Sequence, residues 1–178
     1  WALVYAHLPA VTGSLSLARS RVEILIRRAL DVLELDSLSE LTPDVFSQGR
    51  EGLTAESSRV CEEALAELHR VGPLAAAFET QDKGSCRQLM ADSMNGQMEA
   101  FGAESPRVEA LCQAMRAAPG YIGVRPCQDP YSGCVIALVE KEQITQYCEW
   151  VEGSYSGTIG EAVRLTSLGV GGGARRLH

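Results

Sequence analysis

The hydrophobic pattern of the chain changes its period at Gly120. Before this residue, apolar side chains recur every three to four positions, which is typical of amphipathic helices. After it, the continuous apolar run Cys134–Val139 has the length of a central strand. Strands are predicted at 1–5, 121–125, 134–139 and 162–168, with a short helix over 141–151. This order predicts an α+β fold, an antiparallel four-stranded sheet covered on one face by helices in a split βαβ, ferredoxin-like plan.

Long helices are predicted between the first two strands. The first covers 15–35, and its apolar stripe comprises Ala18, Val22, Leu25, Ala29 and Val32. The second covers 54–71, with the stripe Val60, Ala64, Leu68 and Val71, and Gly72–Pro73 is expected to end or kink it. Asp82–Ser85 provides the cap of a third helix that reaches Phe101, and Ser105–Pro106 begins a fourth.

Composition favours a single globular domain over 1–178. The chain has 178 residues, 46% hydrophobic and 22% charged, and its net charge of −7 argues against nucleic acid or an anionic membrane as a partner. No apolar run is long enough for a membrane-spanning helix. Residues 1–14 are interpreted as a remnant of a strand between two lobes, because the chain begins abruptly in a strand pattern, and 171–178 as a tail.

The six cysteines are predicted to be free thiols in a reducing, cytoplasmic compartment, because most lie within apolar patterns and no pair has CxxC spacing. A zinc site is not expected, since the three histidines are widely scattered. Periodicity and spacing reveal no catalytic residues: there is no Ser/His/Asp set and no glycine-rich loop between a strand and a helix.

Several short segments nevertheless match a known family in order and spacing. Quoted along the chain, they are Arg19-Ser-Arg-Val-Glu23, Asp82-Lys-Gly-Ser-Cys-Arg-Gln-Leu-Met90 with Ser93, Ser105-Pro106, Gly123-Val-Arg125, Ser132-Gly-Cys134 and Gly173-Ala-Arg-Arg-Leu177. Together they resemble the C-terminal half of galactokinases in the GHMP kinase family. The resemblance covers nearly the whole chain and implies the GHMP kinase C-terminal fold.

The departures from the family pattern define the candidate site. Where the family has a glycine-rich third motif, this chain reads Pro126-Cys-Gln-Asp-Pro-Tyr-Ser-Gly133, in which only Gly133 is glycine. Met94 stands where a histidine is usual, and Leu15 aligns with the tyrosine that packs near the sugar. The resemblance therefore implies substrate-binding positions at Leu15, Gln128, Asp129, Ser132 and Gly133, with no metal ligand.

The resemblance implies a full-length sugar kinase that phosphorylates galactose or a related sugar with ATP and Mg²⁺. The family's galactose-recognising segment, phosphate-binding loop and catalytic acid belong to its N-terminal half, and none occurs in this chain. We therefore expect the chain alone to be inactive and to bind no nucleotide. Its expected partners are the N-terminal lobe of the same protein and a small sugar.

Two other interpretations remain at this stage. One is a non-catalytic pseudokinase module that binds a sugar, a nucleotide or a protein, which the degenerate third motif favours. The other is an unrelated α+β domain whose motif matches arise by chance. The segment Trp1–Tyr5, interpreted as an edge strand without its neighbour, also predicts a homodimer formed by strand pairing.

Overall fold

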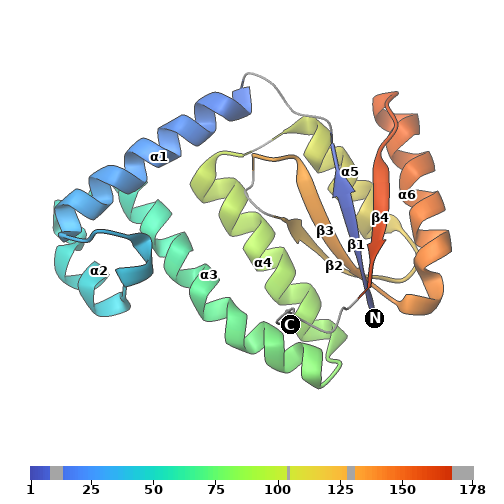
Figure 1. Ribbon diagram of the computed structural model, residues 1–178, viewed down its shortest axis with the longest axis horizontal. Coiled ribbons are helices and arrows are strands. Elements are labelled where there is room, and N and C mark those ends of the chain that lie inside the picture. The colour runs from blue at the N-terminus through green and yellow to red at the C-terminus, as the bar shows by residue number, and fades with distance from the viewer. Residues whose placement is uncertain (9–13, 104, 128–130, 170–178) are drawn as a thin grey trace, which may run out of the picture.

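The computed structural model describes residues 1–8, 14–103, 105–127 and 131–169, with the backbone alone at 14 and 15. A four-stranded sheet lies beside an arm of helices that projects from it (Figure 1). The elements are β1 (Ala2–His7), α1 (Ser14–Leu33), α2 (Pro43–Gly49), α3 (Ala55–Glu79), α4 (Lys83–Phe101), α5 (Pro106–Ala117), β2 (Tyr121–Pro126), β3 (Cys134–Val139), α6 (Ile144–Ile159) and β4 (Arg164–Leu168). The predicted order of elements is confirmed.

The sheet has the strand order β2-β3-β1-β4, and all neighbours are antiparallel. This is the predicted ferredoxin-like arrangement. The expectation that Trp1–Tyr5 forms an edge strand is wrong, because β1 pairs with β3 on one side and β4 on the other. The edges of the sheet are β2 and β4, so an interface formed by strand pairing would have to use one of them.

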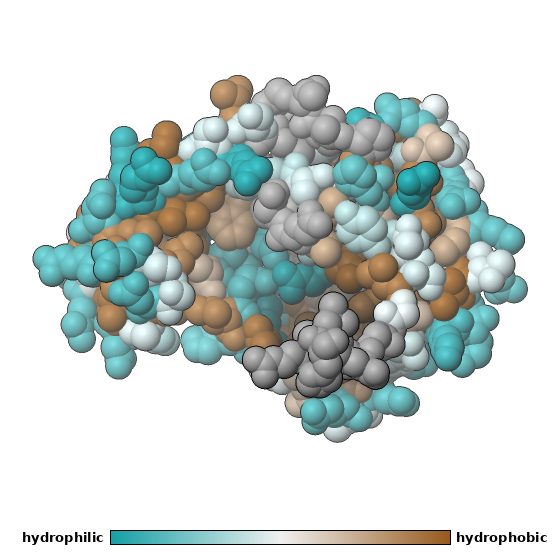
Figure 2. Space-filling view, viewed as in Figure 1, coloured by the Kyte–Doolittle hydropathy of each residue, from teal (hydrophilic) through white to brown (hydrophobic). Residues whose placement is uncertain are grey.

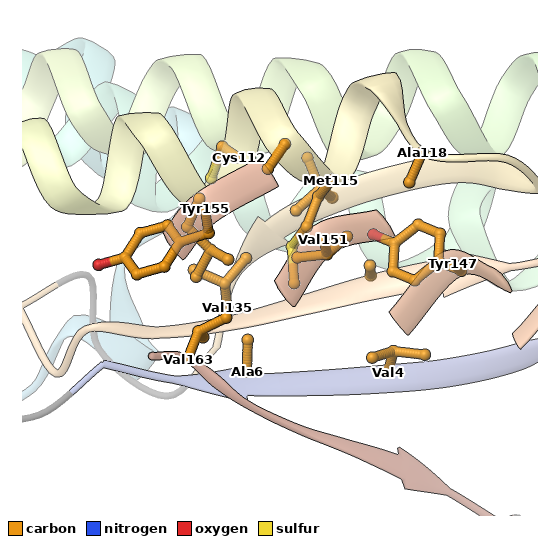
Figure 3. Close-up of a cluster of buried hydrophobic side chains, with 14 of the residues drawn as sticks. Val4, Ala6, Cys112, Met115, Ala118, Val135, Tyr147, Val151, Tyr155 and Val163 are labelled. Atoms are coloured by element: carbon orange, nitrogen blue, oxygen red, sulfur yellow. The ribbon is translucent and has the colours of Figure 1, made fainter. Parts of the chain in front are cut away.

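Both faces of the sheet carry helices, which corrects the expectation of a single covered face. Val4 and Ala6 of β1 point toward α5 and α6, where they join the largest buried cluster with Met115 and Tyr147 (Figure 3). Because side chains alternate along a strand, Leu3 lies on the opposite face. There it packs against a second buried cluster, which consists of Ala77 of α3, Cys86 and Met90 of α4, Ile122 of β2 and Leu138 of β3.

The arm consists of α1, α2 and α3 and has its own apolar interior. Ala29 and Leu33 of α1 pack with Phe46 of α2 and Cys61 of α3. The predicted stripe of α1 is correct at Val22, Leu25 and Ala29, which are buried. The prediction that Val32 belongs to this stripe is wrong: Val32 is exposed, and the neighbouring Leu33 faces the interior instead.

Helix α3 continues through Pro73, which corrects the predicted end at Gly72–Pro73. Proline lacks an N–H and leaves the carbonyl four residues earlier, at His69, without its helical donor. Both residues lie on the solvent side of the helix, so water can satisfy that carbonyl. The predicted positions Leu68 and Val71 are exposed, because the inward face of this part of α3 carries charged residues.

The helix ends follow the capping signals in the sequence. The carboxylate of Asp82 accepts a 3.1 Å hydrogen bond from the Ser85 N–H at the start of α4, as predicted. Pro106 occupies the first turn of α5 after Ser105, also as predicted. Helix α6 is longer than expected and ends at Gly160, which has a φ of 78°.

Candidate functional site

The connection between β2 and β3 closes against the end of β1. The Cys127 N–H donates to the Cys134 carbonyl at 2.9 Å, and the Leu8 N–H donates to the Gly133 carbonyl at 3.0 Å. The Ser132 hydroxyl donates to the Cys127 carbonyl and accepts from the Cys134 N–H, each at 3.2 Å. These bonds hold the described part of the connection beside the chain that leads from β1 to α1.

Gly133 is the position in this connection where glycine is required. Its φ is 69°, a left-handed conformation that residues with a Cβ adopt at a cost. A Cβ there would lie 3.2 Å from the Leu8 carbonyl oxygen, closer than ordinary contact. The retained family glycine therefore has a structural reason, namely the close approach of β1.

Tyr131 attaches the same connection to the helical arm. Its hydroxyl donates to the Phe101 carbonyl at the end of α4, at 2.7 Å. Its ring packs against a buried cluster that contains Val22 and Leu25 of α1 and Val60 of α3. The connection thus lies against α1, whose first turn contains Leu15, one of the predicted substrate-binding positions.

The predicted substrate-binding positions are described only in part. Ser132 and Gly133 lie together in the connection, and Leu15 lies in the first turn of α1 with its side chain outside the described residues. Gln128 and Asp129 also lie outside the described residues. Contact of any of the five with a ligand stays a prediction.

Tyr5 and Cys134 form a polar pair on the sheet, near the same connection. The Tyr5 hydroxyl lies 2.8 Å from Cys134 Sγ. The hydrogen bond with Cys134, together with burial, raises the pKa of Tyr5 to about 12. The phenol therefore stays protonated at neutral pH and serves as a hydrogen-bonding group rather than a base.

A network of charged and polar side chains connects α3 of the arm with α4 and β2. Glu67 of α3 accepts from Arg125 of β2 at 3.0 Å and from Gln97 of α4 at 3.2 Å, and it also pairs with Arg70. Arg70 donates to Glu63 at 2.7 Å. Figure 2 shows the face between the arm and the sheet as hollowed, with hydrophilic residues at its centre.

Gly96 leaves room on α4 for the carboxylate of Glu63 on α3. A Cβ at this position would lie 2.1 Å from Glu63 Oε2, so a larger residue would displace that carboxylate. Sequence analysis did not find the network, although Glu63, Glu67 and Arg70 have the i, i+4, i+7 spacing of one helix face. A hydrophobic pattern cannot show that a charged face is the inward one.

Glu67 is held in its charged form. Burial alone would raise its pKa, but the Ser93 hydroxyl and the charges of Arg125 and Arg70 outweigh burial, and the pKa of Glu67 lies below its usual value. A carboxyl whose pKa is lower in the folded state stabilises the fold above its unfolded pKa. That stabilisation is lost as the pH falls through the folded pKa.

Glu67→Gln is expected to lower the free energy of unfolding at pH 7 and to change it less at an acid pH below the lowered pKa of Glu67, where Glu67 of the parent chain is itself protonated. Urea unfolding across this pH range measures the difference. Glu149→Gln, on the exposed side of α6, is the matched control and should leave the pH profile unchanged. An equal loss at both pH values for Glu67→Gln would contradict the assigned electrostatic role.

No cation site is evident in the described part of the chain. Within it, no three His, Cys, Asp or Glu side chains gather closely enough to hold a metal ion. None of the helices in the same residues is long and apolar enough to cross a membrane.

The sequence has relatives among galactokinases. It is 28% identical to the galactokinase of Canis lupus familiaris over 123 residues, which are 69% of this chain and 31% of that protein. It is 26% identical to the galactokinase of Staphylococcus saprophyticus over 160 residues, 89% of this chain and 42% of that protein. The chain thus spans less than half the length of these relatives. No family model matches the chain.

The fold also matches a solved structure. The crystal structure of Lactococcus lactis galactokinase complexed with galactose superposes with a TM-score of 0.72 at 18% sequence identity. The match covers 93% of this chain and 44% of that one. At this identity the superposition establishes the fold and leaves the activity to other evidence.

The antiparallel β2-β3-β1-β4 sheet with its arm of helices is the fold shared with the matched galactokinase structure, and these findings support a domain similar to the GHMP kinase C-terminal type. The sequence relatives and the structural match together support the description of the chain as galactokinase-like. The resemblance predicted from the sequence motifs is confirmed.

Proposed function

We propose that the protein carrying this chain is a galactokinase-like sugar kinase, which transfers a phosphoryl group from ATP to galactose or a related sugar. The observation that carries the proposal is the match, in sequence and in fold, to galactokinases over most of this chain. The closed β2–β3 connection against α1 adds support, since both elements contain the positions assigned to sugar binding by resemblance.

In this proposal the chain supplies one wall of the sugar site. Leu15, Gln128, Asp129, Ser132 and Gly133 are the proposed substrate-binding residues. Gly133 keeps the connection close to β1, and Tyr131 holds it against the arm. The wall would position the sugar and exclude water, which matters because phosphoryl transfer depends mainly on positioning and charge stabilisation.

The described residues of this chain do not fit ATP and Mg²⁺. They contain no acidic cluster for a cation, and Pro126 offers no N–H to a phosphate at the end of β2. We therefore assign nucleotide binding to an N-terminal lobe of the same protein and derive no step through ATP here. Cytoplasmic residence is part of the proposal, and the six free thiols support a reducing compartment.

The test is an ADP-release assay on the protein that carries this chain, with a panel of sugars that includes galactose. We expect ATP- and Mg²⁺-dependent turnover of galactose or a close relative, and no turnover by residues 1–178 alone. The sugar phosphate should be detected by mass spectrometry in step with ADP. A correctly folded protein that phosphorylates no sugar of the panel would contradict the proposal and favour a non-catalytic sugar- or partner-binding module.

A further inference from the structure

A separate cavity lies between α4 and α5. Its volume is about 550 Å³, within the range of pockets that hold small organic molecules. It contains none of the five positions assigned to sugar binding. An inference about this cavity is therefore independent of the proposed kinase activity.

The interior of the cavity is apolar and adaptable. Met94 and Val108 are almost fully buried and form part of the lining, together with the half-buried Met98. Methionine thioethers make favourable contacts with aromatic rings and adjust to their shape. Two methionines on successive turns of α4 therefore suit a flat aromatic ring.

One polar group in the lining lacks a partner. The Ser105 side chain is 7% exposed, and its hydroxyl has no hydrogen bond to any described residue. An N-cap serine ordinarily accepts a bond from the first turn of its helix, so this hydroxyl is unusual. The hydroxyl oxygen is not among the fully buried, unpaired side-chain atoms of the described residues, so it is open to the cavity, where a ligand atom can replace water as its partner.

The first turn of α5 offers further donors beside Ser105. Pro106 has no N–H, and the N–H groups of Arg107 and Val108 have no acceptor among the residues that the structure describes. The Glu109 N–H is already bonded to the Ser105 carbonyl. A carbonyl oxygen of a ligand is the matching acceptor at such a helix start.

Charge in the cavity is balanced. Glu109 accepts from Gln113 at 3.0 Å and lies 3.6 Å from Arg116, so its carboxylate and the guanidinium offset one another. An anionic ligand would be repelled by Glu109, and a cationic ligand would be repelled by Arg116. The lining thus favours an uncharged ligand over an acid or an amine.

We propose that the cavity between α4 and α5 binds an uncharged aromatic compound that carries one amide or similar carbonyl group. The ring lies against Met94 and Met98. The carbonyl oxygen accepts from the start of α5, and the Ser105 hydroxyl completes the contact.

The probe is benzamide, and the readout is the methyl NMR spectrum of the chain labelled with ¹³C at its methionine methyl groups. The chain has four methionines, so each signal can be assigned by single substitution. Benzamide is expected to shift the signals of Met94 and Met98 in a saturable manner. Met90 and Met115 lie outside the cavity lining and serve as internal controls.

Three comparisons test the proposed contacts separately. Ser105→Ala should weaken benzamide binding about two- to tenfold, the effect of one neutral hydrogen bond, without removing a helix cap. Ser154→Ala on α6 is the matched control and should leave the dissociation constant unchanged. Benzoate and cyclohexanecarboxamide, which change the charge and the aromatic ring respectively, should bind more weakly than benzamide.

Any of three outcomes would overturn the proposal. They are no shift of Met94 or Met98 up to the solubility limit of benzamide, equal shifts of all four methionines, and unchanged affinity in a Ser105→Ala chain whose spectrum shows an intact fold. Benzoate binding as tightly as benzamide would reject the uncharged class.

Discussion

Replacing Leu111 with alanine is expected to lower the free energy of unfolding by about 2–5 kcal/mol. Leu111 has no exposed surface and lies in the largest buried cluster, between α5 and the sheet. Truncation removes apolar contacts and leaves a cavity in a close-packed interior. Since domains of this size are stable by only about 5–15 kcal/mol, this one change should remove a large part of the total.

Urea unfolding followed by circular dichroism measures the loss. Leu17→Ala is the matched control, because Leu17 lies on α1 with 74% of its surface exposed. The control should change the free energy by less than about 0.5 kcal/mol. Equal effects for the two leucines would contradict the assignment of the α5–sheet interface as the main core.

Gly133→Val is expected to destabilise the chain by about 2–5 kcal/mol, the sum of two costs. A β-branched residue is strained at a φ of 69°, and its Cβ would press on the Leu8 carbonyl oxygen. The Leu8–Gly133 hydrogen bond should be lost as β1 and the connection move apart. In a catalytically active protein, sugar turnover should fall together with stability.

The control for this change is Gly153→Val on α6, where a Cβ meets no atom within 4 Å and φ is not positive. It should be neutral or slightly stabilising, because glycine is a poor helix former. Hydrogen exchange at the Leu8 amide gives a local readout. A Gly133→Val chain with parental stability and unchanged protection of Leu8 would contradict the close approach described here.

The sheet could be predicted from the sequence because its signals are local. The apolar run Cys134–Val139 and the shift of period at Gly120 mark strands without knowledge of their partners. The order of the strands in the sheet, in contrast, could not be predicted from local signals. The central position of β1 depends on pairing with β3 and β4, and no local pattern near Trp1 indicates how many neighbours that strand has.

Prediction failed where tertiary contacts outweighed local preference. Pro73 predicts a helix end, but Leu74 and Ala77 pack against the sheet and hold the following turn in place. Leu68 continues an apolar stripe in the sequence, while Glu67 faces inward because Arg125 lies there to neutralise it. The candidate site was predicted from family motifs alone, and the contacts of Tyr131 that hold the β2–β3 connection against the arm are visible only in three dimensions.

The position of β1 has a consequence for biosynthesis. Ala2 pairs with Val139, and Leu3 pairs with Leu168, so β1 leaves the ribosome before both of its partner strands, and its backbone groups remain unpaired until those strands are made. Contacts between such distant residues slow folding. During translation the arm, whose contacts are closer together in the sequence, can form first. Until β3 and β4 arrive, the nascent β1 segment is open to chaperones and to aggregation.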